Sequence, residues 1–332
     1  MEGVYDMDQP LASSSRVQFG RTRLSKQYPE GSASMLPRPS DIALGHAILR
    51  QCSSIFLEAV DSYPELRSGN SMVPLQGALW SPHYEVCRFA FLDTILSLVL
   101  AVPPLIRYDT THRFTVTEPP NPRTLESLYG APFDILVFLG KINAWRTSRW
   151  MGLAKSNTQE WEEAREQIEW WQPEVEYIDE PSNVIGRFAI QEAWRQSALI
   201  YLYMGIYALN SADLRVEAAV RQVVRLCSII RPGAYLERHL LLPSFIAGVA
   251  ARQEQHRAIL RSKVYMSRGL NIWFLPGLHL ASVLDHLWHG AGAGGSPTTW
   301  EDYVDSRCAA LPLIVTSTDS RSEGHSSSDW FR

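Results

Sequence analysis

The stretch from residue 240 to residue 260, LLLPSFIAGVAARQEQHRAIL, contains two amphipathic runs, one directly after the other. Apolar side chains recur in the first run at the spacing of a single helical face, at Leu242, Phe245, Ile246 and Val249. Pro243 suits a first helical turn, because the N–H that it lacks would have no partner there. Gly248 costs a helix about 1 kcal/mol relative to alanine, so we expect another backbone to pack closely against it. The second run has a similar face, formed by His256, Ile259, Leu260 and Val264. Together the two runs predict a helical hairpin packed in a core.

The rest of the chain also has helical rather than alternating periodicity. Its 332 residues are 45% hydrophobic, with 11 Trp, 13 Tyr and 11 Phe, which is enough for a sizeable core. We find no convincing run of alternating β-branched residues and no internal repeat. The sequence therefore predicts an all-α fold, a large multi-helix bundle of about nine to eleven helices.

Prolines and glycines divide this pattern into successive segments. The helices that we expect are 42–62, 84–102, 124–145 with a break near 130–132, 160–171, 187–209, 212–230, a pair within 240–268, 274–288, and a short terminal helix around 301–305. The first helix should bury one stripe, composed of Leu44, Ile48, Cys52, Ile55 and Ala59. We expect a loop at 63–82, and an irregular connection after Pro103-Pro104 with a short extended piece at RYDTT.

Two of these segments carry charges that need an explanation. The segment 84–102 is apolar nearly all round, so we expect it at the centre of the core, with Asp93 in a structural pair with Arg88 or Arg107. The segment 160–171 is rich in glutamate and tryptophan, and its acidic face is interpreted as solvated, the alternative being an acidic interaction surface.

The composition changes near both ends of the chain. Residues 1–37 mix Ser, Gly, Pro and charges without apolar periodicity, which predicts a disordered arm. Residues 38–306 should form the all-α domain, and residues 307–332 a flexible tail. The arm contains a loose basic cluster of Arg16, Arg21, Arg23 and Lys26. We interpret this cluster as solvated; the alternative is that it contacts phosphate or serves as a nuclear localisation signal.

The central hairpin also carries a family resemblance. Leu-Pro-x-Phe-Ile-Ala-Gly, followed by Ala-Arg and then His-Arg, resembles the signature region of the fungal-specific transcription factor domain, the all-helical regulatory part of fungal zinc binuclear-cluster activators. Three more stretches resemble the same family in the same order along the chain: CRFAFLDTILSLVLAVPPLIRYD at 87–109, VLDHLWHG at 283–290 and TTWEDYV at 298–304. The resemblance therefore spans residues 84–305. Arg257 resembles the arginine that follows the hairpin turn in this family. We assign it a structural role, bonding carbonyl ends or an acid, with Glu254 as its nearest partner.

The resemblance implies control of transcription in the nucleus, with the cytoplasm as the alternative location. The partners it implies are proteins of the transcription machinery, a homodimer or a small-molecule effector. The family's six-cysteine DNA-binding cluster is absent from this sequence, whose four cysteines, Cys52, Cys87, Cys227 and Cys308, have no zinc-site spacing. A truncated gene model, a fragment without the cluster, or a true loss of DNA binding would each explain this.

The sequence predicts no catalytic, cofactor-binding, metal-binding or DNA-binding residues. A net charge of −4 disfavours direct nucleic-acid contact, and the apolar window 89–102 is too short to span a membrane. GAGAGG at 290–295 has no preceding strand and is interpreted as a flexible linker, while His279, His286 and His289 lack a companion ligand pattern. The chain is thus expected not to be an enzyme. The alternative to a regulatory domain is an all-α small-molecule-binding or scaffold protein, in which helices 187–209 and 274–288 line a pocket.

Overall fold

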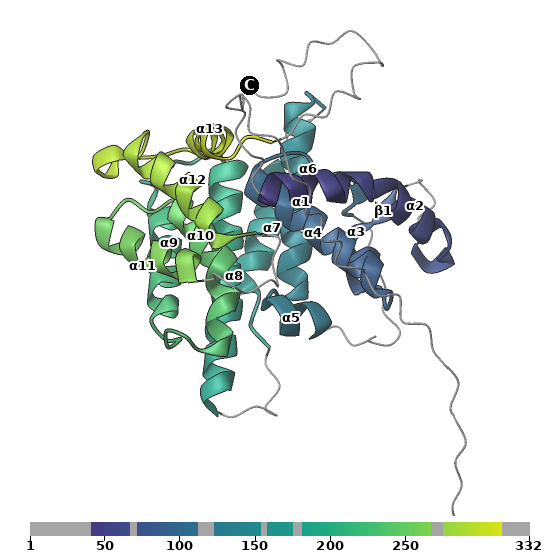
Figure 1. The fold of residues 1–332 in the computed structure, drawn as a ribbon, viewed down its shortest axis with the longest axis horizontal. Coiled ribbons are helices and arrows are strands. Elements are labelled where there is room, and N and C mark those ends of the chain that lie inside the picture. The colour runs from purple at the N-terminus through teal and green to yellow at the C-terminus, as the bar shows by residue number, and fades with distance from the viewer. Residues whose placement is uncertain are drawn as a thin grey trace, which may run out of the picture. The chain divides into compact units, whose positions relative to one another are not determined.

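A computed structural model describes residues 41–66, 72–111, 123–153, 158–174, 181–266 and 275–313 (Figure 1). Thirteen α-helices lie within these ranges: α1 (Asp41–Gln51), α2 (Ser53–Asp61), α3 (Leu75–Trp80), α4 (Tyr84–Leu100), α5 (Arg123–Tyr129), α6 (Phe133–Trp150), α7 (Thr158–Trp170), α8 (Pro181–Gly205), α9 (Leu214–Cys227), α10 (Leu241–Val249), α11 (Glu254–Met266), α12 (Gly277–His289) and α13 (Trp300–Ala310). Three short 3₁₀ segments accompany them: η1 (Pro64–Leu66), η2 (Tyr235–Leu240) and η3 (Ala293–Gly295).

The all-α prediction is confirmed, although the described residues hold more helices than the nine to eleven expected. A turn at Cys52 divides the helix expected at 42–62 into α1 and α2, and α3 occupies part of the loop expected at 63–82. Residues 1–37 of the predicted arm, with their basic cluster, lie outside the described residues, as does most of the predicted tail. At that end α13 continues to Ala310.

The buried face of α1 and α2 is not the predicted one. Leu44, Ile48 and Ile55 are 49%, 52% and 64% exposed. The side chains that face the core instead are Ile42, Leu49, Phe56 and Val60. Both sets have helical spacing, so periodicity could not choose between them. The choice comes from packing, since the ring of Phe56 stacks on Phe89 of α4 with 4.2 Å between centroids.

The helix α4 lies at the centre of the core, as its sequence predicts. Every residue from Phe89 to Leu100 is buried, and α2, α3 and α6 pack against this helix. Asn143 of α6 donates a 2.9 Å hydrogen bond to the carbonyl of Thr94, and the Tyr303 hydroxyl of α13 donates to the carbonyl of Val99. A helix surrounded in this way needs an apolar sequence all round.

Asp93 finds its partners in the backbone, not in the predicted Arg88 or Arg107. Its carboxylate accepts hydrogen bonds from the amides of Leu105 (2.7 Å) and Ile106 (3.1 Å), in the turn that follows α4. The sequence placed arginines nearby, but the Pro103-Pro104 turn presents two N–H groups that fit one carboxylate. Even so, burial raises the pKa of Asp93 from 3.8 to about 6.

Replacing Asp93 with asparagine should change how stability depends on pH. Because the raised pKa makes the folded state bind the Asp93 proton more tightly, this carboxyl's contribution to stability falls as the pH rises from about 4 to 6. We expect the free energy of unfolding of the wild type, relative to Asp93→Asn, to fall by about 2 to 3 kcal/mol between pH 4 and pH 7, as measured by urea unfolding.

The comparison with Asp93→Asn isolates this effect from opposite ones. Burial lowers the pKa of His46 and of His239 to about 4, so both histidines reduce stability as the pH falls below 6.5. Their effect is the same in both proteins and cancels in the difference. A difference that stays constant with pH would contradict the prediction.

The RYDTT piece is extended, as predicted. It contains β2 (Tyr108–Asp109), which pairs in parallel with β1 (Val73–Pro74) from the expected loop. The helix α8 contacts α6, α7, α9 and α10. Figure 1 shows α9 to α12 on one side of α8 and α3 to α6 on the other. The hairpins α8–α9 and α10–α11 confirm the two predicted helix pairs.

Within the described ranges, no helix combines the length and apolarity needed to cross a membrane.

Candidate functional site

Arg257 stabilises the turn between α10 and α11, the two helices that form the signature hairpin. The residue is only 3% exposed, and its guanidinium donates to the carbonyls of Ala251 (2.9 Å) and Gly292 (2.7 Å) and to the carboxylate of Glu254 (2.8 Å). These are the kinds of partner that the sequence predicted. The planar fork of arginine suits this task, since its nitrogens reach two separate backbone segments at once.

The glycine-rich segment at 290–295 is an ordered turn, not the flexible linker that we expected. It contains η3, and two of its carbonyls accept hydrogen bonds from arginine side chains. Gly292 accepts from Arg257, and Gly295 accepts from Arg252 at 2.9 Å. Gly294 and Gly295 have φ angles of 62° and 80°, which explains why glycines stand here. The segment serves the packing of the hairpin.

Gly248 allows a close approach, but the neighbour is a side chain and not the expected backbone. A Cβ atom at Gly248 would lie 2.8 Å from Cδ1 of Leu284 in α12. The indole N–H of Trp288, one turn further along α12, donates to the Gly248 carbonyl at 3.0 Å. The signature residues thus join α10, α11 and α12 into one unit.

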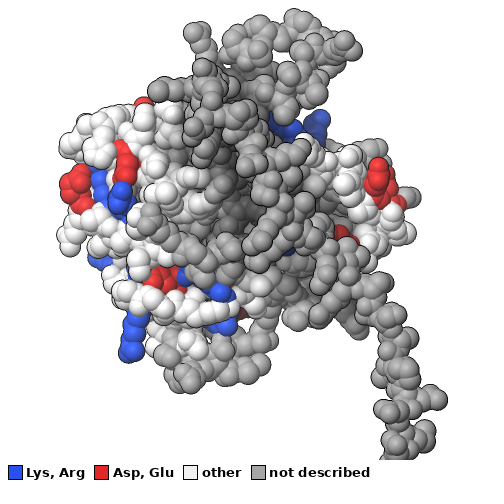
Figure 2. Space-filling model, viewed as in Figure 1, with Lys and Arg blue, Asp and Glu red and all other residues white. Residues whose placement is uncertain are grey.

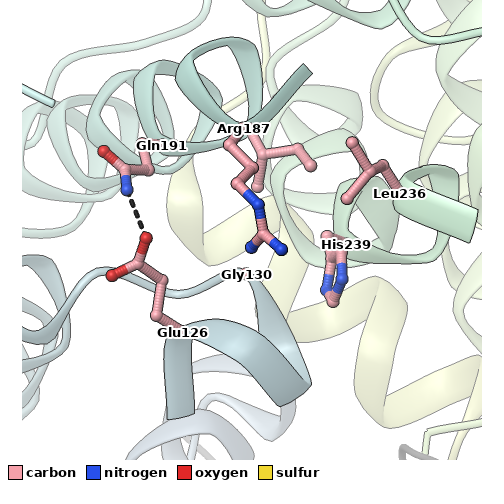
Figure 3. A pocket seen from close by; sticks show the side chains of 7 residues that line it. Glu126, Gly130, Arg187, Gln191, Leu236 and His239 are labelled. Carbon is pink, nitrogen blue, oxygen red and sulfur yellow. Dashed lines mark hydrogen bonds between the residues drawn. The ribbon is translucent and has the colours of Figure 1, made fainter. Parts of the chain in front are cut away.

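A small pocket lies where α5, α8 and η2 meet (Figure 3). It has about 210 Å³ of empty space, which includes space open to solvent, and its enclosed part has room for about one water molecule. Seven residues line it: Glu126, Gly130, Arg187, Ile190, Gln191, Leu236 and His239. Four of the seven have polar side chains, which is unusual in a core that is otherwise apolar.

Two of the lining residues carry buried polar atoms without a hydrogen-bond partner. His239 is 2% exposed and its Nδ1 atom has none. Burial, together with the charges of Arg238 and Arg187, lowers the pKa of this imidazole to about 4, although a backbone hydrogen bond at Tyr129 opposes the shift. Gln191, also 2% exposed, donates from its amide nitrogen to the carboxylate of Glu126 and to the carbonyl of Glu174. Both partners are acceptors, so the amide cannot flip, and its buried Oε1 atom remains unpaired.

Gly130 is required for the shape of this pocket. Its φ angle of 68° is left-handed, and a Cβ atom here would lie 2.6 Å from Cβ of His239 and 2.9 Å from Cγ2 of Ile190. We expect Gly130→Ala to lower the free energy of unfolding by about 2 to 4 kcal/mol, from backbone strain and overpacking together. Urea unfolding measures this loss, and Gly152→Ala is the matched control, because Gly152 has a similar φ of 65° with open space around it. Equal losses in the two variants would contradict the steric part of the prediction.

Comparison with protein families shows where the chain belongs. The model of the fungal specific transcription factor domain matches residues 47–314. The chain belongs to this family. The match begins inside α1 and ends just after α13, so it includes the signature hairpin and the pocket. It confirms the resemblance drawn from the sequence and supports a role in the regulation of transcription. No curated protein and no solved structure matches the chain.

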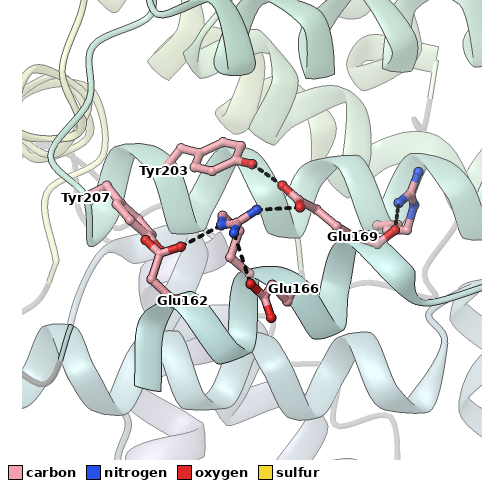
Figure 4. A network of polar contacts seen from close by, with 7 residues as sticks. Glu162, Glu166, Glu169, Tyr203 and Tyr207 are labelled. Carbon is pink, nitrogen blue, oxygen red and sulfur yellow. Dashed lines mark hydrogen bonds and ion pairs between the residues drawn. The ribbon is translucent and has the colours of Figure 1, made fainter. Parts of the chain in front are cut away.

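In this transcription factor domain, a network of hydrogen bonds and ion pairs holds α7 against the end of α8 (Figure 4). Glu162 accepts from the Tyr207 hydroxyl and Glu169 accepts from the Tyr203 hydroxyl, both at 2.8 Å. Arg165 lies between them and bonds to both glutamates. The predicted acidic face is therefore only partly solvated: Glu160, Glu163 and Glu166 remain exposed, while these two glutamates hold the helix in place.

The potential metal ligands of the domain do not converge within the described ranges. No group of three or more His, Cys, Asp or Glu side chains there could hold a metal ion. On α12, His279 is half-buried, whereas His286 and His289 are exposed. The four cysteines are free thiols, and burial raises the pKa of Cys87 to about 11, which makes that thiol unreactive.

The sequence did not reveal the pocket. In the alternative to a regulatory domain, aromatic helices 187–209 and 274–288 would line a pocket. Arg187, Ile190 and Gln191 of the first helix do line this one, but Trp194 and Tyr201 are buried in the core and no residue of α12 reaches the pocket. The pocket uses the polar beginning of α8 instead, together with η2. A possible signal was Gln191, a long polar side chain on the buried stripe of a predicted helix.

Proposed function

We propose that this domain is the regulatory part of a zinc-cluster-type transcription factor, and that it acts in the nucleus without contacting DNA itself. The family match over residues 47–314 carries this proposal. The charge distribution supports it, since the net charge is −4 and, on the face seen in Figure 2, acidic and basic side chains of the described residues are interspersed without forming a basic stripe.

The domain controls transcription, in this proposal, by binding a protein partner or a small effector. A partner could be a component of the transcription machinery or a second copy of the chain. The signature residues are engaged in packing, which suits a domain that must keep its shape while its surface and pocket respond to other molecules. We expect no catalytic activity.

A reporter assay tests the proposal directly. The 332-residue chain is fused to an unrelated DNA-binding domain, and transcription is measured from a promoter that carries sites for that domain. We expect the fusion to change transcription several-fold relative to the DNA-binding domain alone. A matched fusion carrying Glu163→Gln, an exposed change on α7, should behave as the wild type does.

Two further observations separate this proposal from its alternative. Sequencing transcripts upstream of Met1 would reveal an in-frame CxxCxxxxxxC cluster if the factor reads DNA through a preceding segment. Imaging the tagged chain tests the nuclear location. A fusion without effect on transcription, together with a chain that stays outside the nucleus, would favour a ligand-binding or scaffold protein instead.

A further inference from the structure

We propose that the seam between α1 and α13 binds a small oxyanion, a carboxylate or a phosphate, through the buried guanidinium of Arg307. This residue does not line the pocket between α5, α8 and η2. The inference rests on the proposed function, because control by an effector is what gives such a site its use. It names the chemical class of the effector and the side chain that recognises it.

The first observation is that the charge of Arg307 has no compensation in the described ranges. Four lysine and arginine side chains are buried there: Arg146, Arg257, Lys263 and Arg307. Arg257 and Lys263 each contact a carboxylate, and the guanidinium of Arg146 lies 4.5 to 5.8 Å from the centroids of three aromatic rings. Arg307, 2% exposed, is the most buried of the four. Its Nε atom is buried without a partner, and its guanidinium forms no hydrogen bond or ion pair with a described residue.

A buried guanidinium in this state is unfavourable for two reasons. The charge has lost its hydration without gaining a counter-charge, and the N–H group at Nε has lost its bond to water without gaining an acceptor. Arginine side chains that are fully buried in folded proteins are normally paired. We therefore expect Arg307 to meet an anion.

The second observation is that the surroundings of Arg307 are electropositive. His46 of α1 is 6% exposed, and the charges of Arg50 and Arg307 both act on its imidazole. Tyr303, one turn before Arg307 on α13, is within reach of the charges of Arg307 and Arg146. Among the described residues, no carboxylate acts on either His46 or Tyr303. Such a setting repels a cation and attracts an anion.

The donors at this seam suit an oxyanion in particular. A guanidinium presents its N–H groups as a planar fork, which can bind two oxygens of one carboxylate or phosphate. Burial and the two nearby arginines lower the pKa of His46 to about 4, so at pH 7 this imidazole is neutral and offers one N–H. Because Arg307 is almost fully covered, the anion enters only when α1 moves away from α13, which couples binding to the position of α1.

Thermal unfolding and hydrogen exchange test the inference on the full chain. The probes are sodium phosphate, sodium acetate and sodium chloride at pH 7 and equal ionic strength. We expect phosphate or acetate to raise Tm by about 2 °C or more above chloride, in a saturable way, and to slow the exchange of the α1 amides several-fold. A larger effect of acetate identifies a carboxylate effector, and a larger effect of phosphate identifies a phosphorylated one.

Variants locate the binding. Arg307→Met removes an uncompensated charge and keeps much of the volume, so in chloride it should be at least as stable as the wild type, and it should lose the response to the oxyanion. Arg307→Lys keeps the charge without the fork and should bind about tenfold more weakly. Arg225→Met is the matched control, because Arg225 is exposed on α9, and it should respond as the wild type does.

Three results would overturn the inference: equal Tm values in the three salts, a response to the oxyanion that survives in Arg307→Met, or an Arg307→Met chain that is unfolded in chloride. The last result would show that Arg307 already has an essential partner within the fold. The reporter fusion separates this failure from failure of the proposed function. A fusion that regulates transcription while the oxyanion has no effect leaves only the site wrong, and an inert fusion whose chain binds the oxyanion leaves only the transcriptional role wrong.

Discussion

Replacing Lys263 with methionine is expected to lower the free energy of unfolding by about 3 to 5 kcal/mol. The ammonium of Lys263 on α11 lies 2.5 Å from the carboxylate of Glu237 in η2, and the two side chains are only 8% and 9% exposed. The other carboxylate oxygen accepts from the amide of Gly233. Without Lys263, Glu237 is a buried charge with one amide for support, which explains the size of the loss.

Urea unfolding measures this change, and a double variant controls it. Lys263→Met combined with Glu237→Gln removes both charges, so we expect it to recover most of the stability that the single variant loses. A single variant that loses less than about 1 kcal/mol would show that the pair behaves as an exposed one. Because η2 also carries His239 and Leu236, the single variant should disturb the pocket as well.

Replacing Arg257 with alanine is expected to cost about 3 to 5 kcal/mol of unfolding free energy. The change leaves the buried carbonyls of Ala251 and Gly292 without their donors, at about 1 to 3 kcal/mol each. It also removes the guanidinium from the face of Trp288, whose ring centroid lies 5.5 Å away. We expect instability without a specific loss of function, so that the fraction of the protein that remains folded stays active in the reporter assay.

Two further variants show which contact of Arg257 matters. Glu254 is 82% exposed, so Glu254→Ala should cost less than about 1 kcal/mol. Arg257→Lys keeps the charge but cannot reach Ala251 and Gly292 together, so it should lose most of what Arg257→Ala loses. Urea unfolding compares the three. A lysine variant as stable as the wild type would show that charge, and not the fork, is what the site needs.

The sequence by itself determined the fold class, the order of most helices and the family. Helical periodicity located α4 and the α8–α9 and α10–α11 pairs, because the spacing of apolar residues and the position of Pro and Gly act within one or two turns. Arg257 was also assigned correctly, since one of its partners, Glu254, lies three residues away on the same helix.

Only the tertiary structure decided the contacts between segments far apart in the chain. It selected the buried face of α1 and α2, gave Asp93 two amides in place of an arginine, and brought Glu126, Gln191 and His239 into one pocket. For the helical face and for Asp93 the sequence offered more than one acceptable choice, and for the pocket it offered none. The physical reason is that periodicity states that a side chain will be buried, whereas packing geometry alone states what it will touch.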